Sequence, residues 1–138
     1  MTHPQLPLPP VASDLNLRAF PYMPLDAMRL RDSDLAALAT AEEFKAAVLL
    51  WCAAWHQVPA SSLPNDDRIL AKLAACKLIR WKKIREKALK GFIICTDGRL
   101  YHPIIAEKAI EAASKRKRVI IVTGWVSDWQ ACRKSKAE

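Results

Sequence analysis

Glycine is scarce in this sequence, and its scarcity excludes a large class of functional sites. The 138 residues include three glycines, and no two of them lie close together. Phosphate-binding loops need several glycines in a short stretch, because the backbone must turn tightly and approach the phosphates. We therefore expect neither a Walker-type nor a dinucleotide-binding loop, and no nucleotide cofactor.

Metal-binding and nucleophile motifs are lacking as well. The four cysteines are far apart and form no CxxC pair: Cys52, Cys76, Cys95 and Cys132. The three histidines are equally scattered: His3, His56 and His102. Zinc ligands usually come in close pairs, so we expect no metal, no disulfide framework and no catalytic residues. Cys52 and Cys76 fall among apolar residues and are expected in the core.

No long hydrophobic run is present either. The apolar stretches stay well short of the roughly 18–20 residues that a membrane-spanning helix needs. Residues 1–10 are rich in proline and contain no lysine or arginine, unlike a secretory signal peptide. We expect a soluble, cytoplasmic protein in a reducing compartment, with no membrane partner.

Acidic residues become sparse in the second half of the chain. Residues 1–71 hold five Lys/Arg against eight Asp/Glu, whereas residues 72–138 hold seventeen against six. The formal net charge of +8 is therefore carried entirely by the second half. A one-sided basic surface suits a polyanion, either nucleic acid or an acidic protein face.

Composition divides the chain into three parts. Six of the nine prolines lie within residues 1–24, and residues 1–19 are predicted to form a flexible, Pro-rich arm. Residues 20–114 carry the patterns of a single domain, which is what a chain of this length supports. Residues 115–138 are predicted to be a basic tail of uncertain structure. Residues 21–25 are expected to be extended, because proline disfavours helix in the preceding residue, and to dock on the domain.

Two helices are predicted at the start of the domain. Residues 32–39 form a short alanine-rich helix, and Thr40 with Glu43 then makes a capping box that opens a helix to about Gln57. Apolar residues recur in it at helical spacing: Phe44, Val48, Trp51, Cys52 and Trp55. We favour core positions for the two tryptophans over a base-stacking platform.

A loop at residues 58–64 precedes the next helix. Asn65 is its predicted N-cap, with Asp66 and Asp67 in the first turn, where the helix dipole stabilises carboxylates. We favour this capping role over a metal or acid–base site. The inner face is predicted to consist of Ile69, Leu70 and Leu73.

The following helix, predicted from about Leu78 to Lys90, carries the main basic stripe. One side is apolar: Leu78, Trp81, Ile84 and Ala88. The other side is basic: Arg80, Lys83, Lys87 and Lys90, flanked by Lys82 and Arg85. Glu86 is the only acid within the helix. Basic stripes are common on solvated helices, but so complete a stripe favours contact with nucleic-acid phosphates.

Gly91 is expected to end that helix. Phe92–Cys95 and Arg99–His102 are predicted strands, since the Asp-Gly pair between them is typical of a tight hairpin with positive φ. Pro103 opens a fourth helix, and we favour a structural role for His102 over a metal. Apolar residues at helical spacing mark the fourth helix: Ile104, Ala106, Ala109, Ile110 and Ala113.

The order of these elements predicts the fold class. Two helices, a basic helix and a hairpin follow one another as in a winged helix-turn-helix, where the basic helix would be the recognition helix. We therefore expect a mainly α (α+β) domain, a winged helix-turn-helix with a β-hairpin wing and flanking helices.

Several separated blocks also resemble one known family. They occur in the same order: 20–26 (FPYMPLD), 30–34 (LRDSD), 43–44 (EF), 46–57 (AAVLLWCAAWHQ), 63–67 (LPNDD) and 97–103 (DGRLYHP). Together they resemble the YdaU-like family of phage and prophage proteins, which carries domain of unknown function 1376. The resemblance implies a replication-type winged-helix domain, encoded near replication genes and often beside a helicase loader. It brings no catalytic residues.

We expect a nucleic-acid-binding module rather than an enzyme. DNA is the expected partner and RNA an alternative, and the competing hypothesis is a module that binds a helicase loader, another replisome protein or a second copy of the chain. The predicted nucleic-acid-binding residues are Lys77, Arg80, Lys82, Lys83, Arg85, Lys87, Lys90, Arg99, Lys115, Arg116, Lys117 and Arg118.

Overall fold

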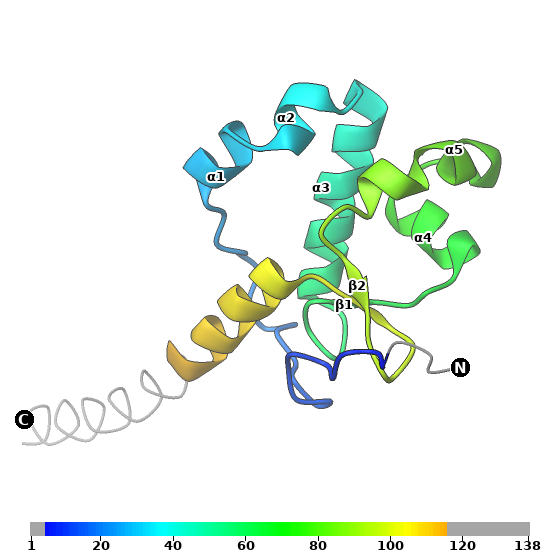
Figure 1. Ribbon diagram of the computed structural model, residues 1–138. Coiled ribbons are helices and arrows are strands. Elements are labelled where there is room, and N and C mark those ends of the chain that lie inside the picture. The colour runs from blue at the N-terminus through cyan, green and yellow to red at the C-terminus, as the bar shows by residue number, and fades with distance from the viewer. Residues whose placement is uncertain (1–4, 116–138) are drawn as a thin grey trace, which may run out of the picture.

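The computed structural model describes residues 5–115, which form a mixed α+β domain in which helices predominate (Figure 1). The elements in chain order are α1 (Ala27–Arg31), α2 (Asp34–Leu38), α3 (Ala41–Trp55), β1 (Ser62–Leu63), α4 (Asp67–Leu73), α5 (Leu78–Ala88), β2 (Ile93–Ile94), β3 (Leu100–Tyr101) and the helical residues 103–115. Within the described part, no helix combines the length and the apolar character needed to cross a membrane.

The sheet is small and antiparallel, with the strand order β1-β3-β2. The β2–β3 hairpin confirms the prediction, and Gly98 takes the expected positive φ of 79° in its turn. The predicted loop at 58–64 was wrong in part, because Ser62 and Leu63 form β1 and pair with β3. A two-residue strand is too short to show alternation, and its partner lies far along the chain.

The main core lies between α3, α4, α5 and the sheet. Leu50, Leu63, Leu70 and Trp81 are fully buried there, so each of the three helices and the sheet supplies a large apolar side chain. Burying a side chain of this size contributes about 1.5–3 kcal/mol. The three helices and the sheet therefore pack together because each of them has an apolar face that is stabilised by burial in the same core.

Two predicted core positions were wrong. Ile69 is exposed, because the inward face of α4 is formed by Leu70, Ala71 and Ala74. Cys52 is also exposed, although its sequence neighbours are apolar. In α3 the side chains of Leu50 and Ala54 point inward, and residue 52 lies about 200° around the helix from residue 50.

A second cluster of buried residues joins the N-terminal segment to the domain. Leu17 packs with Trp55, Ile105 and Ala109, so Trp55 has the predicted core position. Met23, from the segment expected to dock, packs against the same cluster.

Residues 5–19 contain no helix or strand and lie against the domain rather than extending from it. Val11 and Leu17 are buried. The amide of Ala60 donates to the carbonyl of Leu15 at 2.9 Å, and the amide of Thr96 donates to the carbonyl of Pro7 at 3.0 Å.

Side chains cap the starts of α1 to α4, whereas α5 begins after Lys77 without a side-chain cap. Thr40 Oγ1 accepts from the amide of Glu43 at 3.2 Å, and Glu43 Oε1 accepts from the amide of Thr40 at 2.8 Å, which confirms the capping box. At α4 the predicted cap was one residue early. Asp66, not Asn65, is the N-cap, and its Oδ1 accepts from the amide of Arg68 at 2.9 Å.

The cap of α4 can be tested by two neighbouring substitutions. Asp66→Ala removes the acceptor for two first-turn amides and should lower the free energy of unfolding by about 1 kcal/mol. Asn65→Ala is the matched control, because Asn65 is exposed and caps nothing, and it should change stability by less than about 0.5 kcal/mol. Urea unfolding measures both, and equal losses would contradict the assignment of Asp66 as the cap.

Candidate nucleic-acid interface

The rotation of α5 about its axis decides which of its side chains reach solvent. Trp81, Ile84 and Ala88 are buried against the core, which confirms the predicted apolar side. Leu78 packs partly against the same core, and the outward positions include Ile79, which is 75% exposed near the start of the helix. Arg85 and Lys87 lie in the last turn, where cations interact favourably with the helix dipole.

Asp67, in the first turn of α4, holds α5 in this orientation. Its Oδ1 accepts a hydrogen bond from Trp81 Nε1 at 3.0 Å. Arg85 Nε lies 3.0 Å from the same oxygen, in an ion pair without hydrogen-bond alignment. The carboxylate of Asp67 therefore contacts both buried Trp81 and Arg85 on the outer side of α5. This role goes beyond its predicted place in the first turn of α4.

Three cations of the basic stripe pair with acids from other elements. Arg80 forms two hydrogen bonds with Glu42 at the start of α3, one of them from Nε at 3.1 Å. Arg85 pairs with Asp67 of α4, and Lys90 Nζ lies 3.7 Å from Asp34 Oδ2 of α2. The Arg80 hydrogen bond lowers the pKa of Glu42. No local pattern in the sequence reveals the partner of Arg80, because Glu42 lies 38 positions earlier in the chain.

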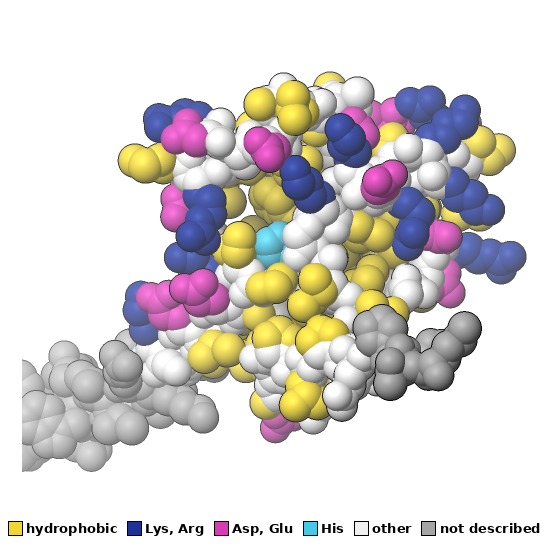
Figure 2. All heavy atoms as spheres, in the orientation of Figure 1, with side chains coloured by type: hydrophobic (Ala, Val, Ile, Leu, Met, Phe, Trp, Pro, Cys, Tyr) yellow, Lys and Arg dark blue, Asp and Glu magenta, His cyan; other side chains and the backbone are white. Residues whose placement is uncertain are grey.

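Four lysines on or directly before α5 make no ion pair within residues 5–115, and we call them the lysine face: Lys77, Lys82, Lys83 and Lys87. All four side chains are exposed. Lys87 is near enough to Glu43 to help lower the pKa of that carboxyl, although a hydrogen bond from Thr40 is the larger cause. Figure 2 shows Lys and Arg side chains gathered on the side of the molecule where α4 and α5 lie.

Arg99 of the hairpin is bound within the domain. Its Nε donates to Ser62 Oγ at 2.9 Å, and its second guanidinium nitrogen donates to Gln57 Oε1 at 3.2 Å. These bonds hold the hairpin to β1 and to the end of α3. Arg99 is among the predicted nucleic-acid-binding residues, and a contact with nucleic acid through its guanidinium would have to break these bonds.

The predicted C-terminal basic cluster is only partly within the described residues. Lys115 pairs with Glu111 on the same helix at 3.0 Å, so its charge is partly balanced there. Arg116, Lys117 and Arg118 lie outside the described residues.

The outer strand of the hairpin has two exposed apolar side chains that the sequence pattern did not reveal. Ile93 and Ile94 of β2 are both exposed. The turn beside them is stiffened by Asp97, whose Oδ2 accepts from the Tyr101 hydroxyl at 2.6 Å and whose Oδ1 accepts from the amide of Arg99 at 3.0 Å. Burial and the neighbouring carboxylate raise the pKa of Tyr101.

His102 is a buried structural residue next to the hairpin. Its side chain is 7% exposed, and the rings of Phe92 and Trp51 meet it edge-on at centroid distances of 5.0 and 5.9 Å. A Cβ at Gly91 would lie 2.7 Å from His102 Nε2, and Gly91 has a φ of 92°, so glycine is required there twice over. Within residues 5–115, no group of three His, Cys, Asp or Glu could hold a metal ion.

Burial lowers the pKa of His102 from 6.5 to about 4, which predicts a pH dependence of stability. Between these values the unfolded chain binds a proton that the folded protein excludes, so stability falls as the pH drops. From pH 6.5 to 5 the loss should reach about 2 kcal/mol at most. Urea unfolding measures the loss, and the ring signals of His102 in NMR should stay constant from pH 7 to 5. A ring that titrates near 6.5 would refute the prediction.

Comparison with known proteins adds a family and no function. No curated protein and no solved structure is significantly similar to the chain. A family model described as "Protein of unknown function (DUF1376)" matches residues 21–110, which include α1 to β3 and most of the last described helix. Since this match covers well over half of the chain, the protein belongs to the DUF1376 family.

Proposed function

We propose that this domain is a winged helix-turn-helix that binds nucleic acid, with DNA as its principal partner. The order α3, β1, α4, α5, β2, β3 and the central place of β3 in the sheet support the proposal. In this arrangement α5 is the recognition helix and the β2–β3 hairpin is the wing.

The lysine face is the observation that carries the proposal. Its four ammonium groups lie on or beside one exposed helix, and no acid of the described part neutralises them by a close ion pair. An 11-residue helix is about 16 Å long and fits a major groove about 12 Å wide. Lys77, Lys82, Lys83 and Lys87 contact phosphates along the groove, and exposed Ile79 can contact thymine methyl groups.

The pairings also narrow the set of contact residues. Arg80, Arg85, Lys90 and Arg99 have internal partners, so we assign them to holding the interface rather than to contacting DNA. Four phosphate contacts predict a slope of about −4 for the logarithm of affinity against the logarithm of salt concentration.

Charge reversal on the lysine face tests the proposal. Lys83→Glu combined with Lys87→Glu should weaken duplex binding roughly tenfold or more and reduce the salt slope from about −4 to about −2, because two phosphate contacts are lost. Fluorescence anisotropy with a labelled duplex at several salt concentrations measures both quantities. Competition with RNA of the same sequence decides between the two nucleic acids.

The matched control reverses two charges elsewhere. Arg31→Glu with Lys108→Glu changes the net charge equally, but α1 and the last described helix lie on the side of the molecule away from α5 (Figure 1). This variant should keep the slope near −4 and most of the affinity. If both variants lose affinity equally, or the unchanged protein binds neither duplex nor single strands at low salt, the proposal fails.

A role in phage or prophage replication is part of this proposal and rests on the resemblance to the YdaU-like proteins. In that setting the domain would bring a helicase loader or another replisome protein to DNA. The family match itself carries no activity.

The second candidate function is a protein-interaction module, favoured by exposed apolar side chains. They lie before α1, in α1 and in α2: Tyr22, Leu25, Met28 and Leu38. Tyr22 is 86% exposed, and exposed apolar patches can mark protein-interaction sites. Light scattering distinguishes self-association from a monomer. Pull-down with nucleic acid present and removed shows whether a partner binds without DNA.

A further inference from the structure

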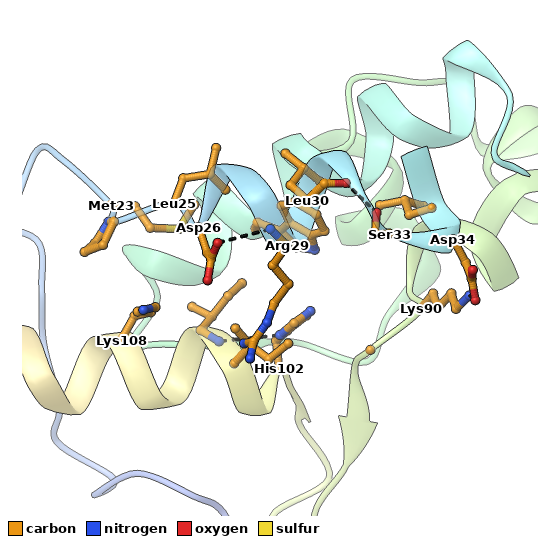
Figure 3. A pocket seen from close by; sticks show the side chains of 16 residues that line it. Met23, Leu25, Asp26, Arg29, Leu30, Ser33, Asp34, Lys90, His102 and Lys108 are labelled. Atoms are coloured by element: carbon orange, nitrogen blue, oxygen red, sulfur yellow. Dashed lines mark hydrogen bonds and ion pairs between the residues drawn. The ribbon is translucent and has the colours of Figure 1, made fainter. Parts of the chain in front are cut away.

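The segment through α1 and α2 forms an arch over a cavity, which we call the arch pocket (Figure 3). Its volume is about 290 Å³. One wall is the arch itself, from Met23 to Leu35, and the other is formed by Trp51 of α3, His102 and the start of the last described helix. The pocket belongs neither to the lysine face nor to the hairpin.

The walls of the arch pocket are mainly apolar. The side chains that supply this character are Met23, Leu25, Leu30, Leu35, Trp51, Ile104 and Ile105. The imidazole of His102 is also part of the lining, and it is neutral at pH 7 because burial depresses its pKa. A concave, largely apolar lining with a few polar groups is typical of sites for small ligands.

Some charged side chains of the lining have partners within the domain, and others do not pair with an acid in the described part. Asp34 pairs with Lys90, and Asp26 caps α1 by accepting from the amide of Arg29 at 3.1 Å. Arg29 and Lys108 make no ion pair among the described residues. In Figure 3 the Arg29 side chain extends from α1 toward His102, while Lys108 rises from the helix on the opposite side.

We propose that the arch pocket binds a small carboxylic acid with an apolar body. The apolar part fills the space between the arch and Trp51, and the carboxylate lies between the cations of Arg29 and Lys108. About 290 Å³ suits a single compact group and excludes a partner's helix, whose diameter is about 10–12 Å. The chain's own residues 116–138 match poorly, since they hold six Lys/Arg and two Asp/Glu.

Few buried contacts hold α1 and α2 to the rest of the domain, so a ligand can enter the pocket. No residue of α1 is buried, and Leu35 is the buried residue of α2. The ion pair between Lys90 and Asp34 is exposed and therefore weak. Closing the arch on an apolar group would bury side chains that now contact solvent, such as Leu25.

The test is an NMR titration of the full chain, labelled with nitrogen-15, at pH 7. The probes are 4-phenylbutyrate, its uncharged amide and 4-phenylbutylamine, which share one apolar body. 4-Phenylbutyrate should shift the backbone N–H signals of residues 23–35 and 102–108. It should bind roughly fivefold more tightly than its uncharged amide. The amine should bind most weakly.

Two variants and a matched control localise the effect. Arg29→Gln with Lys108→Gln should bring the affinities for acid and amide together while leaving that for the amide unchanged. Ile104→Trp, which fills the pocket, should abolish binding of both. Arg31→Gln is the control, because Arg31 lies in the same helix but pairs with Asp32 outside the pocket. It should retain the fivefold preference.

Several results would overturn the proposal. They are equal binding of acid and amide by the unchanged protein, shifts that map outside the pocket, no saturable shift at millimolar probe, or equal losses in the control and the double variant. DNA binding is measured separately by anisotropy, so a failure here leaves the proposed function untouched, and the reverse also holds.

Discussion

The carboxylate of Asp67 accepts a hydrogen bond from Trp81 and pairs with Arg85, and the orientation of α5 depends on these two contacts. Trp81 is fully buried, so its indole N–H must find an acceptor inside the domain. Once Trp81 is fixed, the helical period of 3.6 residues determines which side chains face outward. The exposure of Lys82, Lys83 and Lys87 is therefore a consequence of how Trp81 is buried and hydrogen-bonded.

The same constraint explains why acids from three different elements meet one helix. With α5 fixed against α3 and α4, its flanks come close to Glu42 and Asp67, and Lys90, two residues beyond its end, reaches Asp34 of α2. Exposed pairs of this kind contribute at most about 1 kcal/mol each. Their larger effect is on the surface charge, because they partly neutralise Arg80, Arg85 and Lys90 and leave the lysine face without a close ion pair in the described part.

Features specified by neighbouring residues could be predicted from the sequence. The Thr40–Glu43 capping box, the turn at Gly98 and the helix that opens at Pro103 depend on local backbone preferences, and all three are present. The apolar side of α5 was also predicted, because four residues at helical spacing give an unambiguous period.

What the sequence did not reveal depends on distant partners. Strand β1 exists because Leu63 meets Leu100, a pairing that no local pattern encodes. The neutralisation of Arg80 depends on Glu42, and the retention of Arg99 depends on Ser62, each across 37 or more positions. The arch pocket is likewise invisible in the sequence, since its lining comes from four separated segments. A basic stripe can be predicted from neighbouring residues, but which of its cations pair with acids elsewhere in the domain cannot.

The arginines and the lysines around α5 differ in whether they have partners inside the domain, and this difference predicts the kind of nucleic-acid recognition. Around α5, Arg80, Arg85 and Arg99 all have partners inside the domain, whereas the lysine face has none at ion-pair distance in the described part. A guanidinium is planar and can satisfy two acceptors at once, which suits it to hold neighbouring elements together. It is also the group that most often reads guanine by a bidentate contact. If the arginines are engaged in the fold, the lysines that remain act as point charges on phosphates, which position a protein on DNA without reading bases. The proposed interface is therefore expected to bind with high salt sensitivity and weak sequence preference.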